Sequence, residues 1–280
     1  MPCVNLNGTL LQQMPDQLAI AQRAIYYGDA IFETIRVFDG QIPLFARHEE
    51  RLFSGLSALG FSVPEGWGRG RLHQEILRAA HPCARVRLTV WRSPGGRYAP
   101  ENDDPQFLIV SEPMAGNRFE WPDGGIEVGL CRSVRLPVDQ FSNLKTLNAA
   151  RYVVAAREAR VAGWDDALLL NCHDRVCEAT SSNVFWWEGD RLCTVPLTEG
   201  CVAGVFRATV MEIAGGVLEK NTTWEHLQDA DEIFLTNAVR GIVPVRIFAG
   251  RSLPNRLTER LFHEIQDALW PPAQGNLPKT

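Results

Sequence analysis

The sequence predicts an α+β protein of two domains, and three observations support this. Segments with the period of strands and segments with the period of helices are interspersed through the 280 residues without a regular βαβ alternation. The chain contains no internal repeat and no low-complexity tract. Residues 113–125 (PMAGNRFEWPDGG) show neither apolar period. We therefore expect them to link a domain at 1–112 to a domain at 126–280.

The elements expected in the first half begin with a hairpin. Residues 25–47 predict strand, tight turn and strand: FETIRVF alternates bulky and polar residues, Asp39-Gly40 is a hairpin turn signal, and QIPLF resumes the pattern. Residues 48–59 carry leucines on one stripe and predict an amphipathic helix. The other elements expected before the linker are a helix near 69–80 and strands over 85–92 and 106–113.

The second half is expected to mix short strands with helices. NAARYVVAAREARVA is helical in composition, and Gly163 after it is a helix stop. Short apolar runs between turn signals predict the strands. The strands are expected at 126–131, 166–171, 182–189, 191–196 and 232–237, and the helices at 148–162, near 204–217 and near 257–269.

Composition and charge are typical of a globular cytoplasmic protein. With 45% hydrophobic and 22% charged residues and a net charge of −5, the chain has no basic field to attract nucleic acid or an anionic membrane. We find no signal peptide and no apolar run long enough to span a membrane. The seven cysteines are scattered without a CxxC pair, which favours free thiols in a reducing cytoplasm. Cys172, His173 and Cys177 match no zinc spacing, so no metal is expected.

Lysine is rare in this chain, which narrows the search for a nucleophilic amine. Of the 28 basic residues three are lysines (Lys145, Lys220 and Lys279) and the other 25 are arginines. Arginine stays protonated and forms no stable imine. Lys145 lies in FSNLKTLNAARY between apolar Leu144 and Leu147. Desolvation there would favour its neutral, nucleophilic form. The alternative is a solvated surface charge.

Three further features could complete a site around this amine. Glu178 precedes a strongly apolar strand, where a carboxylate is either buried opposite a cation or solvated at the strand edge. GCVAGVFR at 200–207 puts glycine ahead of a helix, which leaves room for a phosphate against open N–H groups. Arg51 follows His48 on the first predicted helix and either binds an anion or faces solvent. An amine, a carboxylate and phosphate donors together meet the needs of a pyridoxal-phosphate site.

The order of these segments resembles that of a known family. YGDAIFETIRVFDG, HEERL, NLKTLN, EATSSNVFW, GCVAGVFR and ADEIFLTNAVRGIVPV occur in the family's order between residues 27 and 245. The chain is similar to the class IV aminotransferases, the fold-type-IV group that includes branched-chain and D-amino-acid aminotransferases and 4-amino-4-deoxychorismate lyase. The resemblance implies pyridoxal 5′-phosphate as cofactor, a small N-terminal α/β domain and a larger C-terminal pseudo-barrel domain.

Carried over residue by residue, the resemblance implies a cofactor site. Lys145 matches the lysine that forms the Schiff base and shuttles the proton. Glu178 matches the acid that pairs with the pyridinium nitrogen, and Arg51 matches the arginine that binds the phosphate. The backbone amides of Val205 and Phe206 match the helix start that contacts the same phosphate.

A second phosphate-binding loop matches Asn237 and Ala238. Here the chain departs from some relatives, which carry hydroxyl side chains where this chain has Phe206 and Ala238. Main-chain donors are therefore expected to bind the phosphate at both places, helped by the hydroxyl of Thr236.

Substrate groups in this family come from the first strand, the long loop and the last loop. The resemblance therefore points to Tyr26, Arg36, Arg97, Tyr98 and Arg240. An arginine near the site suits a substrate carboxylate through two parallel hydrogen bonds, although each arginine could also be an ordinary surface residue. The resemblance also implies a homodimer with the site at the interface, where the long loop reaches the neighbouring subunit.

Three functions follow from these residues. The first is an aminotransferase that moves an amino group between an amino acid or amine and a 2-oxo acid. The second is the lyase, which releases pyruvate from aminodeoxychorismate to give 4-aminobenzoate; SPGGRY and NAVRGIVPV resemble that enzyme, whereas EATSSNVF is more similar to the aminotransferases. The third is a non-catalytic binding relative, which the retention of Lys145 and Glu178 disfavours. We expect the first.

Overall fold

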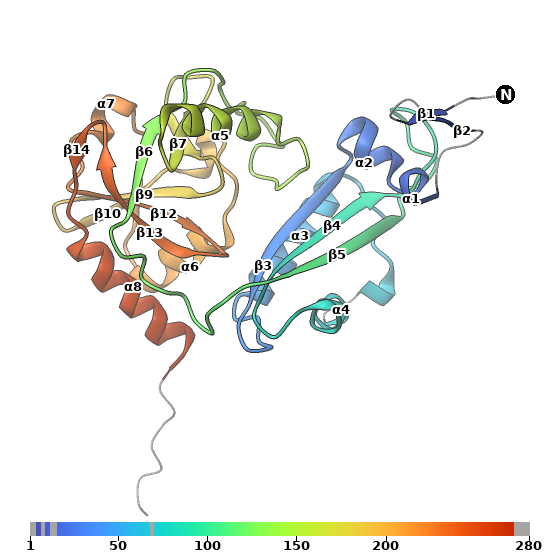
Figure 1. The fold of residues 1–280 in the computed structure, drawn as a ribbon, viewed down its shortest axis with the longest axis horizontal. Coiled ribbons are helices and arrows are strands. Elements are labelled where there is room, and N and C mark those ends of the chain that lie inside the picture. The colour runs from blue at the N-terminus through green and yellow to red at the C-terminus, as the bar shows by residue number, and fades with distance from the viewer. Residues whose placement is uncertain (1–3, 7–8, 12–15, 68–69, 272–280) are drawn as a thin grey trace, which may run out of the picture.

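Two main sheets, one in each half of the sequence, organise the chain (Figure 1). The computed structural model describes residues 4–6, 9–11, 16–67 and 70–271. Its strands mix parallel and antiparallel pairings, and its helices follow no regular βαβ order. The prediction of an α+β chain is therefore confirmed.

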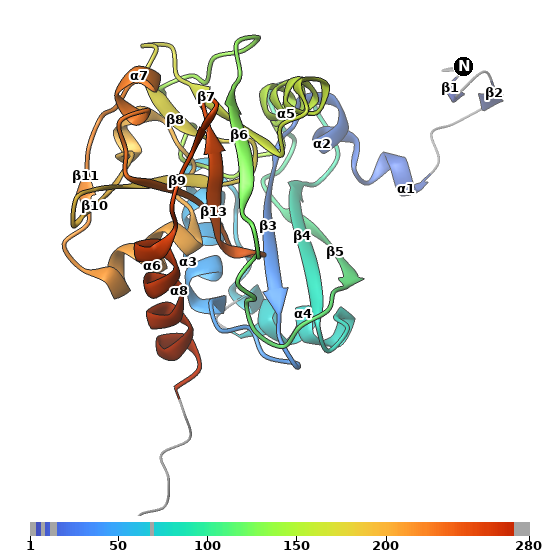
Figure 2. The same ribbon diagram turned by 60° about the vertical axis from the view of Figure 1, so that its left-hand side comes forward.

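The N-terminal sheet is antiparallel, in the order β3 (Ala30–Val37), β4 (Ala84–Arg92) and β5 (Pro105–Pro113). Helices α3 (Phe45–Ala58) and α4 (Arg71–Ala79) cover one face and bury leucines and isoleucines against it. The other face turns toward the C-terminal half of the chain (Figure 2). Alternation along β3 and β4 places Phe32, Thr34 and Arg87 on that second face, where all three line a cavity.

The predicted hairpin is only half right. The turn is present, because Asp39 and Gly40 both have positive φ, at 49° and 72°. The second strand over 41–45 is wrong: Gln41 forms a single bridge to Phe38, and α3 starts at Phe45 rather than at residue 48. Pro43 explains the early end of pairing, since proline has no N–H to donate to a ladder.

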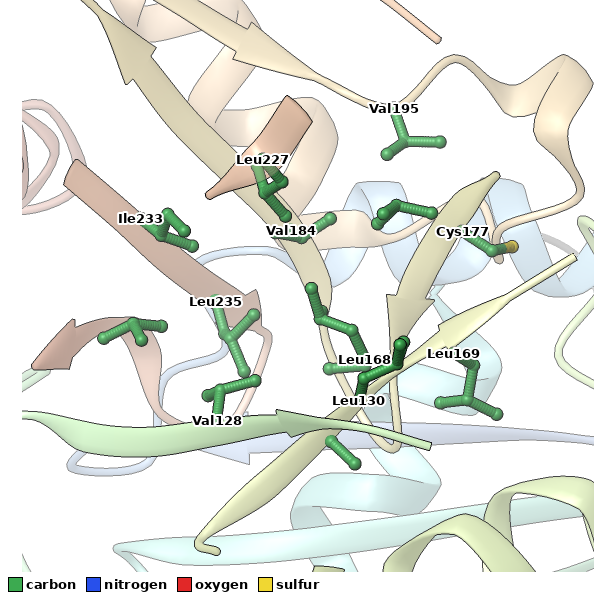
Figure 3. Packing of buried hydrophobic residues seen from close by; sticks show 14 of the residues in the cluster. Val128, Leu130, Leu168, Leu169, Cys177, Val184, Val195, Leu227, Ile233 and Leu235 are labelled. Carbon is green, nitrogen blue, oxygen red and sulfur yellow. The ribbon is translucent and has the colours of Figure 1, made fainter. Parts of the chain in front are cut away.

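The C-terminal sheet curls around an apolar core, as expected of a pseudo-barrel. Its strands run in the order β11-β10-β9-β12-β13-β6-β7-β8, with β14 beside β13. Figure 3 shows Val128, Leu168, Val184 and Leu235 converging from four different strands, and all four are buried. The bounds are β6 (Ile126–Leu130), β7 (Asp166–Leu170), β8 (Val176–Ala179), β9 (Asn183–Glu188), β10 (Arg191–Thr194), β11 (Leu218–Glu219), β12 (Glu232–Asn237), β13 (Gly241–Phe248) and β14 (Arg251–Ser252).

Helices α6 and α8 pack on the outer side of this sheet, against β12. An aromatic cluster with Phe206, Phe234 and Phe262 lies between them. The remaining elements are β1 (Val4–Leu6), β2 (Thr9–Leu11), α1 (Asp16–Ala19), α2 (Gln22–Tyr27), α5 (Ala150–Ala162), α6 (Val205–Ala214), α7 (Trp224–Leu227) and α8 (Arg256–Leu269), with 3₁₀ turns at Glu65–Trp67 and Leu197–Glu199. No helix in the described part of the chain is long and apolar enough to cross a membrane.

Four strands of the second sheet were not predicted: the two-residue strands β11 and β14, and the strands β8 and β13. β8 is short and carries Glu178, and β13 contains Pro244, which breaks the sequence signal for a strand. Residues 114–125 join β5 to β6 without helix or strand. We propose that residues 113–125 are the boundary between the domains at 1–112 and 126–280. Separate hydrophobic clusters under the two sheets support this division.

Candidate active site

A cavity of about 670 Å³ lies where the open face of the N-terminal sheet meets the C-terminal half. β3 and β4 form one wall, and β8, the start of α6 and the turn after β12 form the other. The predicted cofactor residues all line this cavity: Arg51, Lys145, Glu178, Val205, Phe206, Thr236, Asn237 and Ala238. Residues more than 150 positions apart in the sequence are therefore neighbours in space.

Lys145 is held in the cavity by its backbone. The Phe32 amide donates to the Lys145 carbonyl at 2.9 Å, and the Leu147 amide donates to the Ala30 carbonyl at 3.1 Å, so the lysine segment is attached to β3. The Nζ atom lies 4.6 Å from the centroid of the Phe32 ring. Burial, and then the nearby charge of Arg51, lower the pKa of Lys145 to about 8. The amine is therefore much closer to its neutral form than an exposed lysine.

Glu178 presents a buried and well-oriented carboxylate. Its Oε1 accepts from the Tyr152 hydroxyl at 2.6 Å, and its Oε2 accepts from the Val202 amide at 3.1 Å. The Asn183 side-chain amide is 3.4 Å from Oε2. Burial raises the pKa of Glu178 to about 7, although these hydrogen bonds and the charge of Lys145 oppose the rise. A carboxylate in this position gains most by pairing with a cation in the cavity.

The start of α6 offers backbone donors to an anion. Gly204 is the residue before the helix, and a Cβ there would lie 1.9 Å from Asn183 Oδ1, so a larger residue would require the Asn183 side chain to shift. The side chains of Val205 and Phe206 are buried, which leaves their N–H groups as the polar atoms that the helix start can offer.

The turn between β12 and β13 lies beside this helix start in the cavity wall. Asn237 Oδ1 accepts from the amides of Val239 at 3.0 Å and Arg240 at 2.9 Å, which fixes the turn. Thr236 is 1% exposed, and its Oγ1 has no hydrogen-bond partner among the described residues. An unpaired hydroxyl in a cavity wall, next to open helix N–H groups, suits a phosphate oxygen.

Arg51 joins the two halves of the site. Its guanidinium donates to Glu33 through Nε, at 2.8 Å, and through Nη2, and its Nη1 donates to the Ala203 carbonyl at 3.0 Å. Glu33 is fully buried and also meets His48 Nδ1 at 2.7 Å. Arg51 therefore lies in the cavity wall, fixed from β3 on one side and from the loop before α6 on the other.

The predicted substrate residues are more dispersed. Arg240 is exposed and lines the cavity. Arg36 does not line it, since its Nη2 donates to the carbonyls of Ala115 and Gly116 in the linker. Tyr26, with 54% of its surface exposed, also lies outside the cavity lining.

Arg97 and Tyr98 lie in the long loop between β4 and β5, away from the cavity of their own chain. The buried Arg23 donates to the Arg97 carbonyl at 2.6 Å, and the Tyr98 ring lies 5.3 Å from that of Tyr27. Tyr98 is 89% exposed. The loop is thus held to α2 at Arg97 and Tyr98, while the Tyr98 side chain stays largely exposed.

Several cavity residues were missed by sequence reasoning. Arg85 and Arg87 on β4 and Tyr152 on α5 line the cavity, and Glu33 lies behind Arg51. The alternation of RVRLTVWR could have placed both β4 arginines on one face. Nothing in the sequence signals the contacts of Tyr152 and Glu33, which depend on packing between distant segments.

Similarity to known proteins indicates the family to which this chain belongs. Residues 30–248 match the model of the family described as amino-transferase class IV. A provisionally named branched-chain-amino-acid aminotransferase of Methanocaldococcus jannaschii is 28% identical, over 94% of this chain and 95% of that protein. The structure of 4-amino-4-deoxychorismate lyase from Pseudomonas aeruginosa is 31% identical, over 88% of this chain and 93% of its own, with a TM-score of 0.77.

A branched-chain aminotransferase structure from Thermoproteus uzoniensis shares the fold, with a TM-score of 0.80 and 24% identity over 94% of this chain and 93% of that one. The chain thus belongs to the amino-transferase class IV family. It is a pyridoxal-phosphate enzyme of that family, as the sequence predicted. The cavity residues fit this cofactor, because an amine, a buried carboxylate and phosphate donors line one space.

Proposed function

We propose that the enzyme is an aminotransferase that moves an amino group between an amino acid or amine and a 2-oxo acid. The observation that carries the proposal is the presence of Lys145, with its lowered pKa, and buried Glu178 in one cavity. When bound, pyridoxal phosphate supplies an aldehyde that condenses with amines and a ring that accepts electrons from the bond being broken.

The residues of this chain then have distinct roles in the proposal. Lys145 Nζ would hold the cofactor until the substrate amine displaces it, and the freed amine would then carry the proton from the substrate α-carbon to the cofactor carbon bonded to the substrate nitrogen. Glu178 keeps the ring nitrogen positively charged, and Tyr152 and Val202 fix the direction of its oxygens. Arg51 binds the phosphate.

The other phosphate contacts come from the start of α6 and from the turn after β12. They are the backbone N–H groups of Val205 and Phe206 and the groups of Thr236, Asn237 and Ala238.

Arginines suit the substrate's carboxylates. Arg85 and Arg87 on β4 and Arg240 in the turn after β12 all line the cavity. Each guanidinium can hold a carboxylate by two hydrogen bonds. This lining favours substrates with more than one negative group.

We further propose a homodimer in the cytoplasm, with the site at the subunit interface, where Arg97 and Tyr98 serve the partner's cavity and exposed Tyr26 lies at the interface. The exposed apolar side chains of Leu108 and Val110 on β5 and the exposed side chain of Tyr98 support an interface there. Mixing Arg97→Ala chains with Lys145→Ala chains tests whether Arg97 acts in the partner's site. Partial return of activity is expected, because in a mixed dimer one of the two sites would hold native Lys145 from one chain and native Arg97 from the other. No return at any mixing ratio would exclude action in trans.

The lyase is the second candidate function. The 31% identity to the Pseudomonas aeruginosa lyase structure favours it, and two carboxylates on aminodeoxychorismate would suit the arginine-lined cavity. The deciding experiment presents the purified enzyme with a panel of L- and D-amino acids and, separately, with aminodeoxychorismate. An aminotransferase loses the visible band of its cofactor with an amino acid alone and regains it with a 2-oxo acid. Pyruvate and 4-aminobenzoate formed without an acceptor would instead identify the lyase.

A further inference from the structure

Glu33 is a buried carboxylate that the proposed chemistry does not use. It lies in β3, has 0% of its surface exposed, and both of its oxygens are occupied. Oε1 accepts from Arg51 Nε at 2.8 Å, and Oε2 accepts from Arg51 Nη2 and meets His48 Nδ1 at 2.7 Å. Two parallel hydrogen bonds of this kind fix the plane of a guanidinium as well as its position.

The electrostatics exclude an acid or base role for Glu33. Burial alone would raise the pKa of Glu33, but the charge of Arg51 and the hydrogen bonds from His48 and Arg51 outweigh it and hold the pKa at about 2. The group is therefore a permanent anion at working pH. Its charge balances Arg51, which would otherwise be a poorly hydrated cation beside Lys145.

The Nη1 atom of Arg51, which Glu33 does not contact, shows where the guanidinium is held. Nη1 donates to the carbonyl of Ala203, the residue directly before Gly204 and the start of α6. Three of the five N–H bonds of the guanidinium are then used by the protein, and two remain for a ligand. The two remaining N–H bonds therefore sit on a guanidinium whose plane is fixed by Glu33 on β3. The edge of this guanidinium lies at the start of α6.

We propose that Glu33 is a positioning residue, which orients Arg51 so that its remaining N–H bonds meet the cofactor phosphate at the start of α6. The inference rests on the proposed role of Arg51 in binding that phosphate. Without Glu33, the guanidinium keeps its charge but loses its fixed plane. The protein should then bind the cofactor's phosphate group more weakly, while its contacts with the rest of the cofactor should be unchanged.

The experiment measures equilibrium binding to the protein freed of cofactor, with pyridoxal phosphate and with pyridoxal, which lacks the phosphate. Glu33→Gln should weaken pyridoxal phosphate about ten- to hundredfold and leave pyridoxal within about twofold. Glu33→Asp, which keeps the charge but shortens the reach, should fall between wild type and Glu33→Gln and answers the question if the glutamine variant does not fold. Equal weakening of both ligands, or none, would overturn the proposal.

Two control variants separate this inference from the assignment of Arg51. Glu232→Gln removes another buried carboxylate, which binds Leu257 and Thr258 at the start of α8. It should lower the unfolding temperature without changing the ratio of the two affinities. Arg51→Gln should abolish the preference for the phosphate, and adding Glu33→Gln to it should have no further effect. If Arg51→Gln keeps the preference, the proposed function of Arg51 fails; if only Glu33→Gln keeps it, the positioning role fails.

Discussion

The two halves of the molecule form the cavity in different ways. The C-terminal half contributes groups fixed within its own framework: Glu178 on a buried strand, and backbone amides at the start of α6, beside Gly204. The N-terminal half contributes charged side chains that stand on an open sheet face or reach across from a helix, such as Arg87 and Arg51. One wall is built of buried polar groups and backbone, and the other of long side chains.

The two walls suit the two requirements of the site, which are binding of the cofactor and choice of the substrate. A buried carboxylate whose direction is fixed by hydrogen bonds, as that of Glu178 is, can hold one cofactor in one orientation. The half-buried arginines on β4 can change with less effect on the fold than the buried groups, because substitutions at partly exposed positions usually cost less stability. We therefore propose that the C-terminal wall, together with Arg51, binds the cofactor, and that the β4 arginines of the N-terminal wall contribute to substrate choice. Lys145 lies between them, since its segment is hydrogen-bonded to β3.

Removing the amine of Lys145, which lies between the two walls, should have the largest effect on activity. Lys145→Ala is expected to lower turnover by roughly 10³-fold or more, because in the proposed function this residue both holds the cofactor and moves the proton. Borohydride reduction of the native enzyme followed by peptide mapping should place the cofactor on Lys145. The matched control is Lys220→Ala, since Lys220 pairs with Glu188 away from the cavity. A label on Lys220, or turnover that survives in Lys145→Ala, would contradict the assignment.

Glu178 tests the buried wall by itself. Glu178→Gln keeps the size of the side chain but cannot hold a positively charged ring nitrogen, so kcat should fall roughly 10²-fold with a smaller change in KM. The cofactor should largely remain bound, which its visible absorbance measures. Glu232→Gln serves as the control for loss of a buried carboxylate. Near-normal turnover in Glu178→Gln would mean that another acid contacts the ring.

The elements that were predicted correctly are those with strong local patterns. RVRLTVWR and the glycine after NAARYVVAAREARVA predicted β4 and the end of α5 at nearly the right residues. The strand at 41–45 failed because one proline outweighs the alternating pattern. β8 was missed because it is short and includes a carboxylate whose burial depends on partners far away in the sequence.

The resemblance to a family predicted which distant residues the fold brings together in the site. Hydrophobic periodicity predicts local elements only and could not have predicted this. Lys145, Glu178 and Thr236 line one cavity although they come from separate segments. Glu33 was not predicted because its neighbours in FETIRVF suggest only a strand. Its partner Arg51 comes from the next helix, and a tertiary contact of that kind leaves no local signal.

Gly204 tests how closely the buried wall is packed, with an effect smaller than that of Glu178. In Gly204→Ala the new methyl group would meet Asn183 Oδ1, whose side chain also contacts Glu178. We expect a loss of about 1–3 kcal/mol in the free energy of unfolding and roughly tenfold weaker cofactor binding, since the Asn183 side chain beside Glu178 must shift. Denaturant unfolding and equilibrium binding measure the two. Gly66→Ala is the control, because its methyl group would meet only the end of the Arg71 side chain; equal losses in both variants would argue against a special role for Gly204.

The smallest expected effect is a shift of pH dependence where the two walls meet. Burial and the charge of Arg51 lower the pKa of Lys145 from 10.5 to about 8, so the reactive neutral amine should appear as the pH rises through about 8. Labelling of the cofactor-free protein with trinitrobenzenesulfonate, followed by mass spectrometry of the Lys145 peptide, measures this midpoint. Arg51→Gln removes a positive charge and should move the midpoint to higher pH, whereas Arg78→Gln, a surface arginine paired with Glu75, should not. A wild-type midpoint near 10.5 would mean that Lys145 is hydrated, and an unchanged midpoint in Arg51→Gln would mean that the N-terminal wall does not influence the amine.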